Sequence, residues 1–377
     1  MESVEDAPPK PDPNANANTV ARPGAARLPR LKAGPLGAVI LLLIALPCLF
    51  SLPWALTAPG DADRGQRYND ERLGISKVHD ENAQFQPPGT VHYLRQQQEG
   101  EELVEVERSA FEPMGTDRFG GSLLIRCLMG GAISLGVGIS AALVAVFIGV
   151  TWGSIAGYVG GRTDAFMMRI VDIFYGLPYL LLVIMISVMV SGLTSRLDGY
   201  IAAQTAADAS YQPFFLLKLI QKNPLIINLL TLVAAIGGVS WLTMARVIRG
   251  QVLSLRTLPF IEAARAQGMG PLRIIRVHLL PNLMGPIIVY TTLAVPQAIL
   301  QESFLSFLGI GVQEPLPSWG QLAAEGVKEL PALAMPELPI NWWLLVFPCL
   351  LLGLTLLSLN FMGDALRERF DPRSAKR

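Results

Sequence analysis

The sequence predicts an all-α polytopic membrane protein, and two observations predict that class. The first is composition: the 377 residues are 51% hydrophobic and only 16% charged, with a mean hydropathy of +0.42, which is too apolar for an ordinary soluble domain. The second is a series of apolar runs, each long enough to cross about 30 Å of hydrocarbon as a helix. Six such runs occur, at about 35–57, 131–158, 170–192, 225–245, 284–310 and 342–362.

The first apolar run lies behind an amino-terminal segment that is rich in Pro, Ala and Asn. Such a composition cannot bury a core, so residues 1–34 are expected to form a disordered tail. The run at 35–57 is longer than the apolar stretch of a typical cleaved signal peptide. We therefore expect it to be retained as the first transmembrane helix.

Charged residues between the runs predict the orientation. The segments before the first run, between the second and third, between the fourth and fifth, and after the sixth are rich in Lys and Arg, and such segments stay in the cytoplasm. The segments after the first and fifth runs carry several Glu residues instead. We expect cytoplasmic termini, an extracytoplasmic segment at 58–128, a transmembrane core at 129–366 and a cytoplasmic tail at 367–377. The extracytoplasmic segment is either a small subdomain or a partly ordered loop.

Glycines stand at four-residue intervals at the end of the second run. On a helix they form one ridge without side chains, along which a neighbouring helix can approach closely. We expect them to serve helix packing. They are Gly149, Gly153, Gly157 and Gly161.

A polar segment at about 257–282 separates the fourth and fifth runs. Pro259 suits the first turn of a helix, Glu262 stands near the positive amino-terminal end of that helix, and Gly268 can adopt the left-handed conformation that ends it. These residues predict a short cytoplasmic helix.

The same segment carries a specific motif. Glu262-Ala263-Ala264, Gly268 and Leu280-Pro281 stand at the spacings of the EAA loop of binding-protein-dependent ABC importer permeases. His278 occupies the usual Ile position, which resembles the variant of the dipeptide/oligopeptide/nickel branch. The chain is therefore similar to the permeases that receive a separate ATPase through this loop.

Other stretches resemble the C-type permease subunit of that branch, and the resemblance covers roughly residues 115–373. They include Gly115-Thr116-Asp117, the segment 301–313 and the carboxyl-terminal Gly363-Asp364. The branch usually continues the first of these with Gly-Arg-Asp. This chain has Gly120-Gly121-Ser122 instead, so the charged pair of the branch is missing.

The resemblance implies six helices of the type I ABC importer permease kind, with a cytoplasmic coupling helix, in the bacterial inner membrane. It implies import of dipeptides or oligopeptides delivered by an extracytoplasmic binding protein. The other partners would be a homologous second permease subunit and two ABC ATPase subunits, which bind ATP and Mg. This chain would itself bind no cofactor, metal or nucleic acid and would catalyse no reaction.

The resemblance also assigns an ATPase-coupling role to the loop. Phe260 and Ile261 would form an apolar anchor, while Ala263 and Ala264 would let the helix lie close to the ATPase. The full set of expected coupling residues is Phe260, Ile261, Glu262, Ala263, Ala264, Gly268, Leu280 and Pro281.

Two acidic residues in apolar runs are candidates for the transport pathway, because ionisable groups in a membrane are often functional. Asp172 lies near the cytoplasmic end of the third run, and Glu302 lies in the outer half of the fifth. Each has a structural alternative. Asp172 could pair with Arg169 or cap a helix, and Glu302 could hydrogen-bond between helices.

Other functions remain open from the sequence. The same machinery could carry nickel or another small solute. A secondary transporter would be expected to show broken helices or several buried carboxylates near mid-membrane, and a membrane scaffold would leave the EAA loop unexplained. The sequence contains no Gly-x-x-x-x-Gly-Lys-Ser/Thr and no His-Glu-x-x-His, so it lacks a phosphate-binding loop of its own and a zinc-protease motif.

Overall fold

The computed structural model describes residues 33–56, 84–99, 102–118, 120–207, 224–313, 316–330 and 341–370. Within these ranges six stretches of helix are long and apolar enough to cross a membrane, which confirms the predicted number of spans. They are α1 (Ala33–Leu56), α3 (Leu123–Val159), α5 (Tyr179–Ala207), α7 (Pro224–Leu255), the stretch that ends in α10 (Leu280–Phe307), and α12 (Trp343–Phe370). Of the predicted tails at 1–34 and 367–377, residues 1–32 and 371–377 lie outside the described residues. α1 begins at Ala33 and α12 extends to Phe370, so both helices reach into the predicted tails.

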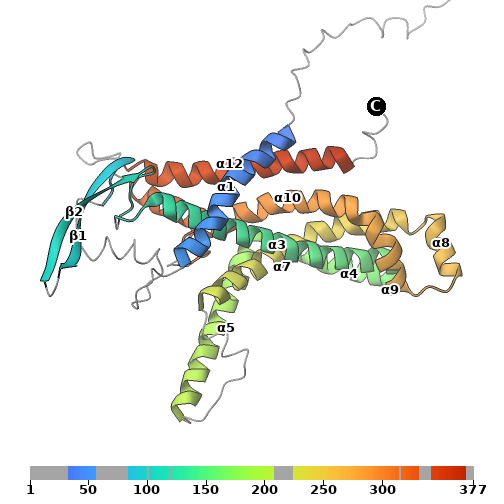
Figure 1. The fold of residues 1–377 in the computed structure, drawn as a ribbon. Coiled ribbons are helices and arrows are strands. Elements are labelled where there is room, and N and C mark those ends of the chain that lie inside the picture. Colours follow the sequence, from blue (N-terminus) through green and yellow to red (C-terminus); the bar gives the residue numbers. More distant parts are fainter. Residues whose placement is uncertain are drawn as a thin grey trace, which may run out of the picture.

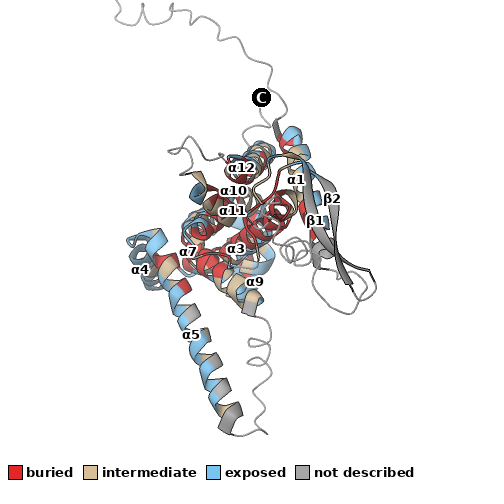
Figure 2. Ribbon diagram, turned by 90° about the vertical axis from the view of Figure 1, so that its left-hand side faces the viewer, coloured by how far each residue is buried: buried red, intermediate tan, exposed pale blue. Residues whose placement is uncertain are grey.

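The helix pair α3 and α7 forms the centre of the bundle, and buried residues concentrate on it (Figure 2). Ala141 of α3 and Ile236 of α7 are fully buried in one apolar cluster. Large apolar residues on the outside of α3, such as Leu143 and Phe147, are exposed, which suits a surface in contact with lipid. Small residues such as Ala141 let α3 and α7 approach closely. Close packing is how helices associate in lipid, where no hydrophobic driving force acts between them.

The second span begins at Leu123, earlier than the predicted position 131 and inside the predicted extracytoplasmic segment 58–128. Arg126 interrupts the apolar pattern in this first turn. In the structure Arg126 is buried and paired with Asp117 and Glu325. Because the charge is neutralised by residues elsewhere in the chain, the helix extends through a position at which hydropathy predicts a loop.

The predicted third span at 170–192 is divided. α4 (Gly161–Tyr175) is a separate helix with exposed faces, and α5 starts only at Tyr179. Pro178 explains the break, because proline disfavours helical backbone at the residue before it and lacks the N–H that a continuing helix needs. α5 then leaves the bundle as a projecting helix (Figure 1).

A hairpin lies at the end of the bundle opposite the short helix α8 (Pro259–Ala266) (Figure 1). Its strands β1 (Gly89–Glu99) and β2 (Glu102–Glu112) are antiparallel, with Gly89 opposite Glu112 and Glu99 opposite Glu102. Ser122, the residue before α3, donates a hydrogen bond to the Glu112 carboxylate (2.5 Å). The sequence analysis did not predict these strands, because Gln and Glu residues interrupt the alternating apolar pattern of a half-buried strand.

Candidate functional site

The short helix predicted to begin at Pro259 is present as α8 (Pro259–Ala266), at the end of the bundle opposite the hairpin (Figure 1). Pro259 occupies its first turn after the extended Leu258 (φ −81°, ψ 146°). Gly268 has φ +75°, and its backbone N–H donates to the Arg265 carbonyl oxygen (2.9 Å). The left-handed stop predicted at Gly268 is therefore confirmed.

The two faces of α8 differ from the predicted arrangement. Ile261 is 0% exposed and Ala264 is 3% exposed, and both pack against α7 and the start of α10 in the chain itself. The sequence predicts that Ile261 and Ala264 contact the ATPase, but in this chain they lie on the inward helix face, since residues three apart share one face. Phe260, Glu262 and Ala263 are exposed instead.

The rest of the loop continues the exposed surface through α9 (Pro271–Ile274) and a π-helical turn, η2 (Ile275–Leu279). A cavity of about 680 Å³ opens among Gly270, Leu272, Arg276 and their neighbours. Leu272 and Val277 are exposed, Leu280 is half-buried and Pro281 is exposed in the first turn of α10. We call the exposed residues Phe260, Glu262, Ala263, Leu272 and Val277 the tip surface.

An ion pair and a hydrogen bond join the helix ends beside the tip surface. Arg249 of α7 binds both carboxylate oxygens of Asp164 in α4 (2.5 and 2.6 Å). This hydrogen-bonded guanidinium lowers the pKa of the Asp164 carboxyl, which keeps it ionised at neutral pH. Arg256 donates to the Gly157 carbonyl oxygen (2.9 Å). The ends of α3, α4 and α7 are therefore fixed to one another beside α8.

Three of the four predicted packing glycines face α7. A Cβ atom added at Gly149 would lie 2.6 Å from Met244 Cβ, one at Gly153 would lie 2.5 Å from the Ala245 carbonyl oxygen, and one at Gly157 would lie 2.9 Å from Val252 Cβ. Gly161 does not belong to this ridge, since a Cβ there would meet open space. It begins α4 with φ +58°, a conformation that glycine adopts readily.

The two acidic pathway candidates have different surroundings. Asp172 pairs with Arg246 of α7 (2.8 Å), and not with Arg169 as the sequence alternative suggests; the two side chains are 61% and 39% exposed. Glu302 is 0% exposed and accepts hydrogen bonds from the hydroxyls of Ser306 (2.8 Å) and Ser303 (3.2 Å). Glu302 is thus buried and hydrogen-bonded as a structural residue would be, although both of these serines belong to α10 itself and not to a neighbouring helix.

A cavity that the sequence analysis missed lies among the end of α4, the start of α5, α7 and α10. Its volume is about 330 Å³, and Tyr179, Ser240, Thr243, Gln297 and Gln301 contribute its polar lining. We call it the polar cavity. The spacing of Gln297 and Gln301, one helical turn apart within an apolar run, is the signal that could have indicated it.

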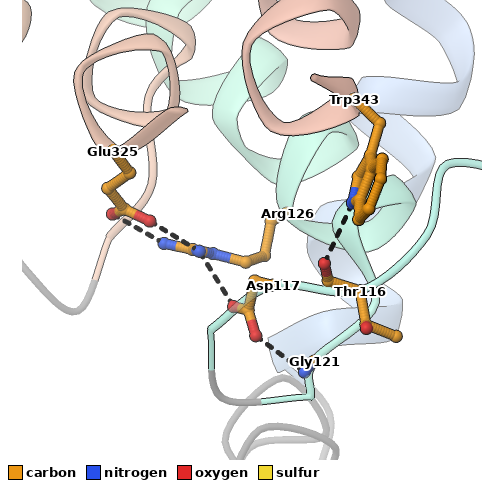
Figure 3. A network of polar contacts seen from close by, with 6 residues as sticks. All are labelled: Thr116, Asp117, Gly121, Arg126, Glu325 and Trp343. Atoms are coloured by element: carbon orange, nitrogen blue, oxygen red, sulfur yellow. Dashed lines mark hydrogen bonds and ion pairs between the residues drawn. The ribbon is translucent and has the colours of Figure 1, made fainter. Parts of the chain in front are cut away.

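A buried polar network connects α3, α11 (Trp319–Lys328) and the start of α12 at the hairpin end (Figure 3). Arg126 contacts Asp117 (2.9 Å) and makes two hydrogen bonds to Glu325 (2.8 and 2.9 Å). Asp117 also accepts the Gly121 N–H (2.8 Å), and the Trp343 indole donates to the Thr116 carbonyl oxygen (3.3 Å). The Gly115-Thr116-Asp117 motif therefore has an internal partner, Arg126, although the usual following charges are missing.

Comparison with known proteins identifies the family. The family model "Binding-protein-dependent transport system inner membrane component" matches residues 149–376. The dipeptide transport system permease DppC of Bacillus subtilis is 40% identical over 70% of this chain and 70% of its own length, and the oligopeptide permease OppC of Haemophilus influenzae is 39% identical over 69% and 70%. A putative peptide transport permease of Brucella suis is 30% identical over 93% of this chain and 90% of its own length. The chain thus belongs to the family of binding-protein-dependent transport system inner membrane components, as a multi-pass permease.

Proposed function

We propose that this chain is the permease subunit of an ATP-driven importer of dipeptides or oligopeptides. The observation that carries the substrate class is the 40% identity to a permease named for dipeptide transport, beside similar identity to oligopeptide permeases. The proposal includes an extracytoplasmic binding protein that delivers the peptide and two ATPase subunits that bind ATP and Mg. In this proposal both termini are cytoplasmic.

The tip surface is the proposed docking site for an ATPase subunit. It offers an exposed aromatic ring at Phe260, a small residue at Ala263 and exposed apolar side chains at Leu272 and Val277. Ile261 and Ala264 fix α8 to α7 and α10. Because α8 is packed onto the spans, a displacement of the docked ATPase would move the spans with it, which is what coupling requires.

The projecting helix α5 is the proposed contact for the second permease subunit. Its exposed apolar residues include Leu181, Met185, Val188 and Met189, and Leu182 and Val183 bind it to the core of this chain. A homologous subunit with the same projecting helix could cover this surface.

Reconstitution tests the proposed function. The complex of this permease with its second permease, ATPases and binding protein is placed in proteoliposomes, and uptake of a labelled tripeptide is measured with ATP and without it. ATP-dependent uptake of the tripeptide supports the proposal. ATP-dependent uptake of nickel without peptide uptake would refute the peptide assignment.

Substitutions on α8 should separate docking from folding. Ala263→Arg places a bulky charge on the exposed face, and we expect about tenfold weaker co-purification of the ATPase, in the range of interface hot spots, with normal membrane insertion. Ala264→Asp buries an unpaired charge against α7 at a cost on the order of several kcal/mol, so the yield of folded permease should fall. Gln251→Arg adds the same charge at an exposed position of α7 and is the control. Normal ATPase association of Ala263→Arg would contradict docking through this face.

The orientation is tested with single cysteines in a cysteine-free background. A cysteine at Thr90, which is exposed in the hairpin, should react with a membrane-impermeant maleimide in spheroplasts, while one at Arg265 on α8 should react only after the membrane is permeabilised. The basic segments predict this difference. Labelling at Arg265 from outside would reverse the orientation and exclude a cytoplasmic coupling helix.

A further inference from the structure

We propose that the polar cavity binds main-chain amide groups of the transported peptide, with Gln297 and Gln301 as the binding side chains. The proposal rests on the peptide-import function given above and names a substrate contact for it. The proposal assigns the substrate contact to Gln297 and Gln301, and not to the pathway candidate Glu302.

The first support is the fixed orientation of the Gln301 side chain. Its Oε1 accepts a hydrogen bond from the Tyr179 hydroxyl, and the Ser240 hydroxyl lies 3.3 Å from the same oxygen. Ser240 in turn donates to the Ile236 carbonyl oxygen (2.8 Å). Among the residues that the structure describes, none accepts a hydrogen bond from the Gln301 amide nitrogen, which leaves its two donors for a ligand.

The second support is the position of Gln297. It lies one helical turn before Gln301, so both amides are on one face of α10, and both line the polar cavity. The Gln297 side chain is exposed. An amide that faces hydrocarbon without a partner is costly, so the exposed Gln297 beside Gln301 on a transmembrane helix indicates a surface that meets polar groups.

The third support is the lack of charge in the cavity lining. No Asp, Glu, Lys, Arg or His is among the described residues that line it. The nearby Arg246 is paired with Asp172 and stacks 4.0 Å above the Tyr175 ring. Glutamine side chains donate to peptide carbonyls and accept from peptide N–H groups. They can therefore bind the main chain of a peptide whatever its sequence. A nickel ion would require nitrogen, sulfur or carboxylate ligands instead.

The contrast with Glu302 strengthens this assignment. Successive residues on a helix are about 100° apart, and Glu302 points into the bundle, where serine hydroxyls satisfy it. Gln301 points to the polar cavity. A neutral amide therefore stands at the cavity while the carboxylate one position later is kept out of it. This arrangement admits peptides without selecting for their side-chain charge.

Photo-crosslinking tests the contact directly. The photoreactive residue p-benzoylphenylalanine replaces Gln297 in the complete importer, and a radiolabelled tripeptide is supplied on the binding protein with ATP. We expect label on the permease at this position. Replacement of Leu300 is the matched control, because Leu300 is also exposed on α10 and does not line the polar cavity. Equal labelling at both positions, or none at Gln297, would overturn the proposal.

Transport measurements give a second, independent readout. Gln297→Leu and Gln301→Leu remove the hydrogen-bonding groups and keep similar size, and each should lower tripeptide uptake about three- to tenfold, as expected for one or two lost hydrogen bonds. ATP hydrolysis stimulated by the loaded binding protein should persist, because the tip surface is unchanged. Wild-type uptake rates in the double variant would overturn the proposal while leaving the peptide-import function intact. Absence of tripeptide uptake in the unsubstituted importer would instead refute the import function and this inference with it.

Discussion

Replacing Arg126 with Met should strongly destabilise the hairpin end of the protein. Arg126 is the shared cation of Asp117 and Glu325, whose side chains are 2% and 17% exposed. Its loss would remove the guanidinium that pairs with both carboxylates, and removing one partner of a buried ion pair typically costs about 3–5 kcal/mol. We expect the melting temperature of the purified permease in detergent to fall on the order of 10 °C.

Two variants make this prediction specific. Asp172→Asn breaks the pair with Arg246, in which both side chains are exposed. Such exposed pairs contribute at most about 1 kcal/mol to stability. The melting temperature of this variant should therefore fall by less than about 3 °C. Adding Asp117→Asn to Arg126→Met removes one of the stranded charges and should recover part of the loss. Equal shifts for the buried and the exposed pair would show that the network in Figure 3 contributes little to stability.

The second large effect is expected from Gly153→Leu. A Cβ at this position would lie 2.5 Å from the Ala245 carbonyl oxygen and 3.0 Å from the Arg249 backbone nitrogen. These are backbone atoms of α7 and cannot rotate away, so α3 and α7 would have to separate at the centre of the bundle. In lipid the lost contacts have no hydrophobic compensation. We expect little folded, monodisperse permease by size-exclusion chromatography.

Gly136→Leu provides the matched control for this experiment. Gly136 lies on the same helix, α3, and a Cβ there would meet nothing within 4 Å. The two variants share the change in helix propensity and in hydrophobicity, so a difference in yield reports the α3–α7 contact. If Gly153→Leu accumulates as well as Gly136→Leu, the close packing of these helices is not required for folding.

Features that depend on neighbouring residues could be predicted from the sequence. The six spans follow from continuous apolar runs, and the limits of α8 follow from Pro259 and Gly268. The ridge of Gly149, Gly153 and Gly157 follows from the four-residue helical spacing. In each case the determining interactions are local: the transfer of side chains to lipid, the backbone freedom of single residues and the helical repeat.

Features that depend on residues far apart in the chain required the tertiary structure. From the sequence, Arg126 marks the limit of an apolar run. Only the structure shows that Glu325, 199 positions away, lies beside it and neutralises its charge. The amphipathic pattern of α8 does not say whether Ile261 and Ala264 face a partner or the chain itself; the apolar cluster with α7 and α10 decides this. Neighbours in sequence can also have opposite environments, as Gln301 and Glu302 do. The hydropathy of a helix does not depend on how the helix is rotated about its own axis. The packing of the other helices fixes that rotation.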